Sequence, residues 1–145
     1  MSVTTAMTTS FKQELLQGLH DLDGHTLKLA LIKSGESGTF GAASTNFSNI
    51  TDSSDEASGT GYSSGGATLG SVAITTSGTT AFVDFADVSF SNSTISASGA
   101  MIYNSSAGNR AIAVISFGGT VASTAGTFTV TMPTADASNA IIRLA

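Results

Sequence analysis

The sequence predicts a mainly β protein: an antiparallel β-sandwich or barrel of about seven strands with one short N-terminal helix. The chain has 23 Ser, 21 Thr and 16 Gly among its 145 residues, a composition that favours strands and the turns between them. Apolar residues make up 41% of the chain, which is too many for a disordered protein. Apolar segments recur every ~10 to 15 residues, and this spacing is typical of a sandwich or barrel.

The chain has the length of one domain and can bury a single core. Neither an internal repeat nor a domain boundary interrupts residues 9–145, which we expect to form a single β-rich domain. Residues 1–8 are mostly small and polar. They are predicted to form an extended N-terminal arm, with Val3 and Met7 as its apolar anchors.

Residues 9–23 carry the one convincing helical pattern of the sequence. Ser10 is placed to cap this helix, with Gln13 as its reciprocal partner, and Gly24 is placed to end it in the left-handed conformation. Four apolar residues recur at spacings of four, four and three, which puts them on one stripe of a helix: Phe11, Leu15, Leu19 and Leu22.

Seven further segments read as strands, because their side chains alternate or are apolar throughout and Gly, Ser, Asn or Pro bounds them. RAIAVISF is apolar on both faces and is expected at the centre of a sheet, and Pro133 ends the later strand GTFTVTMP. The expected strands lie at 26–33, 67–76, 79–90, 94–103, 110–117, 126–133 and 139–145.

Residues 34–58 form a long polar loop, and such a loop in a compact domain is functional, mobile or covered by a partner. Asp52, Asp55 and Glu56 form either a solvated acidic stretch, which we favour, or a calcium site without EF-hand spacing. The large apolar residues of this loop are Phe40, Phe47 and Ile50.

The stretch HDLDGH brings four potential metal ligands together at the end of the predicted helix. They are His20, Asp21, Asp23 and His25. Carboxylates at a helix C-terminus are unfavourable, which raises the case for a bound cation or a partner subunit. A metal site needs three or four convergent ligands, however, so we favour a solvated helix end and predict no metal.

Charge and composition exclude several classes of function. The net charge of −5, with no basic run, disfavours binding to nucleic acid and to anionic membranes. The chain has no Cys, which excludes disulfides, thiolate metal sites and cysteine nucleophiles. The first ten residues show neither the basic nor the apolar region of a secretory signal, and no segment approaches the length of a membrane span.

Candidate catalytic groups do not form a recognisable centre. Residues 61–65 match the G-x-S-x-G nucleophile motif around Ser63, but a strand rather than a helix is predicted to follow. Asp84 and Asp87 lie close in sequence at a strand end, and we favour a strand position for Asp84 and a turn for Asp87 over acid–base work. We expect no enzyme activity and no cofactor.

Two arginines are candidates for ion pairs. Arg110 and Arg143 could each pair with Asp84, Asp87 or Asp136, within one subunit or between subunits. The sequence does not choose between these pairings.

Four segments of the chain resemble a family of small virion structural proteins of tailed bacteriophages. The similarity extends to the N-terminal helix and the strand TLKLALIKS, and it leaves out residues 34–57. The segments are SGTGYSSGGATL, TTAFVDFADVSFSNSTISASGAMIYN, NRAIAVISFGG and TFTVTMPTADASNAIIRLA. The resemblance implies a capsid decoration (cement) protein on the virion surface, made in the host cytoplasm, with a tail, baseplate or fibre component as the alternative.

The resemblance also implies partners: the major capsid protein and other copies of the chain, with a trimer favoured. The N-terminal arm could add a strand to a capsid sheet, since backbone hydrogen bonds give affinity with little demand on side chains. We expect the arm and the 34–58 loop to order on such contact. The candidate partner-contact residues are Val3, Met7, Phe40, Phe47 and Ile50.

Overall fold

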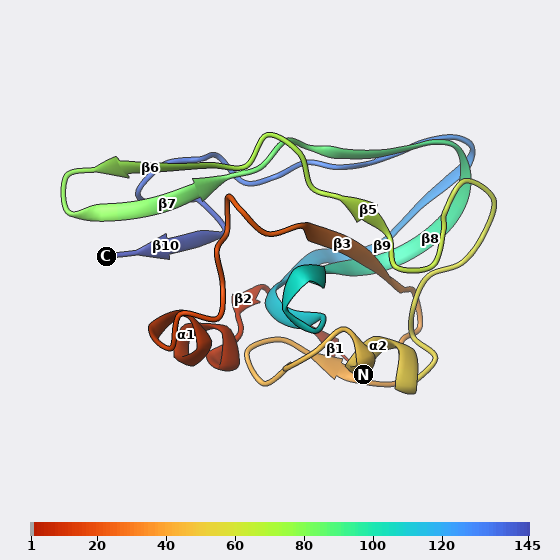
Figure 1. Cartoon of the computed structure of the whole chain (residues 1–145). Coiled ribbons are helices and arrows are strands. Elements are labelled where there is room, and N and C mark those ends of the chain that lie inside the picture. The colour runs from red at the N-terminus through yellow and green to blue at the C-terminus, as the bar shows by residue number, and fades with distance from the viewer. Residues whose placement is uncertain (1) are drawn as a thin grey trace.

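The computed structural model describes residues 2–145 and confirms the predicted fold class (Figure 1). The protein is mainly β, with 47% of residues in strands and 11% in helices. Antiparallel sheets dominate, and their arrangement is an open, sandwich-like one rather than a closed barrel. Within residues 2–145, neither helix has the length and apolar character needed to cross a membrane.

Within the described residues 2–145, ten strands and two α-helices follow one another. The helices are α1 (Thr9–Leu16) and α2 (Ser48–Asp52), with a 3-10 turn, η1, at Ser105–Ala107. The strands are β1 (Ser2–Val3), β2 (Ala6–Met7), β3 (Leu27–Lys33), β4 (Thr39–Phe40), β5 (Ala67–Thr68), β6 (Ala73–Ser77), β7 (Thr80–Asp84), β8 (Val88–Asn104), β9 (Arg110–Val130) and β10 (Ile142–Leu144).

A long ribbon of β8 and β9 forms the backbone of the fold. The two strands pair antiparallel from Asn104 and Arg110 next to the η1 turn to Val88 and Val130 at the far end. Figure 1 shows the ribbon bending over, so that its two halves lie in different layers. Register shifts and the left-handed backbone of Asn92 and Ala125 accompany this bend, as expected for β-bulges.

The remaining strands add to this ribbon or form small sheets beside it. The five-stranded sheet has the order β2-β9-β8-β3-β5, and every neighbouring pair in it is antiparallel. A separate antiparallel sheet has the order β10-β7-β6, and its β6–β7 hairpin projects from the body (Figure 1). Strands β1 and β4 form a short parallel pair.

The five-stranded sheet is packed on both faces. The main core contains Phe11 of α1, Leu29 and Leu31 of β3, Ile102 of β8 and Ile112 of β9, together with residues of the outer ribbon half. A second core lies on the other face. Its members are Ile32, Phe40, Ile50, Met101, Ala111 and Val114, with Val3 and Phe47 at its edge.

The structure places the N-terminal arm and the 34–58 segment on the protein's own sheet. Strand β2 pairs with Ala113 and Val114 of β9, and β1 pairs with β4 inside the 34–58 segment. That segment also contains α2, so it is a folded excursion rather than a plain loop. The two regions cover the second core together, which explains why they carry apolar residues at all.

The predicted helix over 9–23 is wrong at its C-terminal end. Thr8, not Ser10, is the N-cap, and its hydroxyl oxygen accepts a hydrogen bond from the Phe11 backbone N–H. The helix ends at Leu16 because Gly18 adopts the left-handed conformation there, with φ of 74°. The Leu19 N–H then bonds the Glu14 carbonyl, so the Schellman closure forms at Gly18, six residues before Gly24, where it was expected.

Candidate functional site

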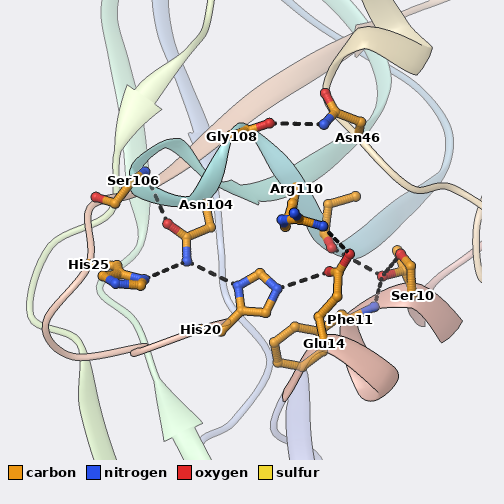
Figure 2. A network of polar contacts seen from close by, with 12 residues as sticks. Ser10, Phe11, Glu14, His20, His25, Asn46, Asn104, Ser106, Gly108 and Arg110 are labelled. Atoms are coloured by element: carbon orange, nitrogen blue, oxygen red, sulfur yellow. Dashed lines mark hydrogen bonds and ion pairs between the residues drawn. The ribbon is translucent and has the colours of Figure 1, made fainter. Parts of the chain in front are cut away.

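A chain of polar side chains crosses the protein between α1 and the η1 turn, and Figure 2 shows it from close by. Glu14 of α1 accepts hydrogen bonds from Arg110 Nη1 at 3.0 Å on one carboxylate oxygen and faces His20 Nε2 at 3.0 Å on the other. His20 Nδ1 lies 3.0 Å from the side-chain nitrogen of Asn104. Glu14 and His20 are buried and Asn104 has no exposed surface, so this network is internal.

The amide of Asn104 joins two histidines. Its nitrogen lies 3.0 Å from Nδ1 of His20 and 3.0 Å from Nδ1 of His25, while its oxygen accepts the Ser106 backbone N–H at 3.0 Å. Because the oxygen is occupied by that N–H, the amide must present its two hydrogens to the histidines. Both Nδ1 atoms are therefore acceptors, and His20 is left to donate from Nε2 to Glu14.

The local sequence explains how these groups meet. Glu14 lies three residues after Phe11, so both side chains project from the same face of α1 toward the sheet. The turn at Gly18 then returns the chain so that His20 packs edge-on against Phe11, with ring centroids 5.1 Å apart. Asn104 and Arg110 are direct partners across the β8–β9 hairpin, which places them side by side at its end.

The HDLDGH stretch is therefore a folded turn rather than a solvated helix end. The Asp21 carbonyl accepts the N–H groups of Gly24 and His25, and the Asp21 carboxylate also accepts the Gly24 N–H. The two histidines converge on Asn104 instead of on the aspartates. Among residues 2–145 no three His, Asp or Glu side chains are grouped as a metal site would require.

The network is suited to holding parts of the fold together. Both ring nitrogens of His20 are engaged, and the Glu14 carboxylate is shared between His20 and Arg110. The interactions tie α1 and the 18–25 turn to the hairpin end of the central ribbon.

Sequence reasoning identified His20 and His25 but missed Glu14 and Asn104. Glu14 could have been identified from its position three residues after Phe11, which places both side chains on one face of the helix. No local pattern in the sequence distinguishes Asn104.

A second polar centre surrounds Asp55 in the 34–58 segment. Its carboxylate has no exposed surface and accepts the backbone N–H groups of Ser37 at 2.9 Å and Gly38 at 2.8 Å. Lys33 Nζ lies 3.5 Å away. Burial alone would raise the pKa of Asp55, but hydrogen bonds from Ser37, Ser53 and Gly38 outweigh it and lower the pKa to about 2.

This arrangement predicts a loss of stability in acid. The pKa of Asp55 is lower in the folded chain than its ordinary value of 3.8, so its contribution is present above that value and disappears as the pH falls toward about 2. We expect Asp55→Asn to lower the free energy of unfolding by about 1–3 kcal/mol at pH 7, because the buried N–H donors lose a charged acceptor. Urea unfolding between pH 7 and 2 measures both effects.

The exposed residue Asp52 provides the matched control for this prediction. Asp52→Asn makes the same chemical change three residues away and should leave the urea midpoint within error of the wild type. The Asp55→Asn variant should also lose part of the acid sensitivity of the wild type between pH 4 and 2. Equal stability of the two variants at neutral pH would contradict the role assigned to Asp55.

Glu56 turns to a different set of partners. Its carboxylate accepts hydrogen bonds from the Tyr62 hydroxyl at 2.8 Å, the Ser64 hydroxyl at 2.9 Å and the Gly65 N–H at 2.5 Å. Burial raises the pKa of Tyr103 to about 12, and the Glu56 charge adds to this shift. Asp52, Asp55 and Glu56 thus do not converge on one point, and the buried Asp55 is not part of a solvated acidic stretch.

The other sequence candidates are dispersed. Ser63 lies in a turn that leads to β5 and not to a helix, so the nucleophile-elbow geometry is absent. Asp84 is exposed on β7, whereas the Asp87 carboxylate accepts the Met132 N–H at 2.7 Å.

The arginines have separate partners as well. Arg110 pairs with Glu14, which was not among the carboxylates considered for it. The pKa of Asp136 is lowered chiefly by the Asn139 side chain and the Ser138 N–H, and the Arg143 charge contributes to this shift. Of the pairings left open by the sequence, the structure therefore brings Arg143 near Asp136.

The residues predicted to contact a partner lie mostly inside the chain. Phe40 is 2% exposed and Ile50 is fully buried, so neither offers side-chain surface to a partner in this conformation. Val3 and Phe47 are half-buried at the edge of the second core, and Phe47 stacks on Tyr103, whereas Met7 packs against the main core. Partner contact through these five residues stays a prediction.

An apolar cleft opens between the end of α1 and the small β10-β7-β6 sheet. It has a volume of about 230 Å³, and its walls come from Leu15 and Leu22 on one side and from Val83 and Ile142 on the other. His20 of the polar network also lines it. This cleft, unlike the internal polar centres, is open to solvent and can accept a group from outside the chain.

We find no match to this chain among protein-family models, curated proteins or solved structures. The assignment of a role therefore depends on the geometry described above and on the sequence resemblance.

Proposed function

We propose that this chain is a structural protein of a tailed-phage virion that decorates the capsid and stabilises the head by binding the major capsid protein and neighbouring copies. The observation that carries the proposal is the use of the polar side chains. Glu14, His20, Asn104, Asp55 and Glu56 all bond to groups of the chain itself, whereas the cleft beside α1 is apolar. A protein whose polar side chains are used in this way acts by binding other proteins.

The fold supports the same role. Both faces of the five-stranded sheet are packed, and the N-terminal arm is held in place by β9, which gives a stiff body for repeated attachment. Because β1 and β2 pair within the chain, capsid contact by a free arm would require these strands to leave their own sheet. Surfaces of the folded body, rather than a released arm, are therefore the better candidates for the capsid contact.

Localisation in the particle tests this proposal. Purified chain is added to capsids assembled without it, and the particles are imaged by electron cryomicroscopy while mass spectrometry counts the bound copies. Head decoration predicts density at every equivalent lattice position on the outer surface. Density confined to the tail, baseplate or fibres would contradict decoration and support the alternative, and absence of the chain from particles would contradict both.

A further inference from the structure

The exposed apolar side chains of this protein gather around one cleft. Among residues 2–145 five large apolar residues are exposed, and four of them come from the elements that frame the apolar cleft. Ile74 and Leu144 line it directly, and Leu16 and Leu19 are the sequence neighbours of its wall residues Leu15 and His20. Leu16 is 92% exposed, which is unusual for leucine in a folded domain. Such a cluster marks a binding surface.

This face carries both a projecting group and a hollow to receive one. Leu16 projects from the last turn of α1, and its neighbour Leu15 forms part of the cleft wall. A surface with a projecting side chain beside a cleft can bind a second copy of itself about a two-fold axis. Each copy then inserts its projecting side chain into the cleft of the other. Burial of both Leu16 side chains would remove the most exposed leucine of each copy from water.

The charges around the cleft complement one another in such an arrangement. Lys12 precedes Leu16 by one helical turn, so both project from the same side of α1. Lys12 forms no ion pair within residues 2–145. Asp21 lines the cleft, and Asp23 lies two residues further along the same exposed turn. Insertion of Leu16 into the cleft of a neighbour would bring Lys12 next to these two carboxylates.

We propose that the Leu16 side chain of a second copy of this chain occupies the cleft between α1 and the β10-β7-β6 sheet, with Lys12 of each copy facing Asp21 and Asp23 of the other. This self-association deepens the contact with neighbouring copies that the proposed function includes, but the free protein should show it without any capsid. A monomeric free protein would therefore contradict this contact without contradicting binding to the capsid.

Analytical ultracentrifugation of the full chain over a wide concentration range tests the contact. The wild type should self-associate, and Leu16→Lys should weaken the association at least about tenfold, since one buried leucine contributes that much affinity. Val121 is the fifth exposed apolar residue and lies in β9, away from the cleft, so Val121→Lys is the matched control. It should associate like the wild type.

Charge exchange tests the register of the contact. Lys12→Glu and Asp23→Lys should each weaken association, and the two changes combined in one chain should restore it. Circular dichroism and thermal melting verify that each variant remains folded, which is expected because these residues are exposed. A monomeric wild type, undiminished association of Leu16→Lys or equal weakening by Val121→Lys would overturn the proposal.

Cross-linking gives a second, independent measurement. The chain has no Cys, so a single introduced thiol can react only with another introduced thiol. Leu16→Cys mixed with Ile74→Cys should form a disulfide-linked pair under mild oxidation, whereas Val121→Cys mixed with Ile74→Cys should not. Equal yields from the two mixtures would count against Leu16 as the inserted group.

Discussion

Replacing Gly66 by alanine is expected to cost this protein about 3 kcal/mol or more of its free energy of unfolding. Gly66 has φ of 81°, and a Cβ atom there would lie 1.8 Å from the Leu29 carbonyl oxygen and 2.6 Å from the Leu29 carbonyl carbon. Both are backbone atoms of β3 in the main core and cannot move aside cheaply. The alanine variant must therefore break the pairing of β3 with β5 next to Leu29 and Ala67.

Gly70 supplies the control for this prediction within the same short segment. A Cβ atom at Gly70 would meet nothing within 4 Å. Gly70→Ala should therefore change the free energy of unfolding by no more than about 0.5 kcal/mol. Chemical denaturation of both variants, followed by circular dichroism, measures the difference. A Gly66→Ala variant as stable as Gly70→Ala would mean that β5 does not lie against β3 as described.

The second large effect is expected at Asn104. Asn104→Leu keeps a side chain of similar size but removes the donor to His20 and His25 and the acceptor of the Ser106 N–H. The His20 side chain is fully buried and would lose the partner of its Nδ1 atom. We expect the free energy of unfolding to fall by about 3–5 kcal/mol, since several buried polar groups are left unsatisfied at once.

Asn104→Asp separates the loss of hydrogen bonding from a loss of packing. The introduced carboxylate can still accept the Ser106 N–H, but it can bond to a histidine Nδ1 only when that nitrogen carries a proton. Asn104→Asp should therefore keep the bond from Ser106 and lose the two bonds to the histidines, so its free energy of unfolding should lie between those of the wild type and Asn104→Leu. Urea midpoints of the three proteins at pH 7 compare them, and a wild-type midpoint for Asn104→Asp would contradict the bridging role.

The short-range features of the fold were predictable from the sequence. The alternation in TLKLALIK and the apolar run of RAIAVISF identified β3 and the buried part of β9, and Phe11 marked the inward face of α1. These signals are local, because burial of one strand face or one helix stripe imposes a period on the sequence itself.

The long-range features were not predictable in this way. We expected separate strands at 110–117 and 126–133, but the polar, Gly-containing residues between them continue β9 because Ala97, Ser96 and Ile95 of β8 pair with them. Conversely, the expected strand at 79–90 divides at Phe85–Asp87, where the chain passes from the small sheet to the ribbon. In both cases the strand boundaries depend on pairing with a neighbouring strand, and such pairing leaves no periodicity in the sequence.

The polar network shows the same limit. HDLDGH was recognisable as a cluster of potential ligands, but the role of its histidines depends on Asn104, whose side chain reaches His20 across 84 residues of chain. No local pattern distinguishes that asparagine from the other five in the sequence. The early end of α1 was easier to predict from the sequence, because a glycine at position 18 adopts the observed left-handed conformation at little cost.

The docking of the N-terminal arm has a consequence for how this protein emerges from the ribosome. Thr5 bonds to Ser116 across 111 residues, so the arm is synthesised well before its partner strand β9. Until then the nascent chain carries Val3 and Phe40 without the surface of β9 that later covers them. A product terminated before β9 would keep this apolar surface open to chaperones and proteases, whereas a chain that includes β9 can cover it.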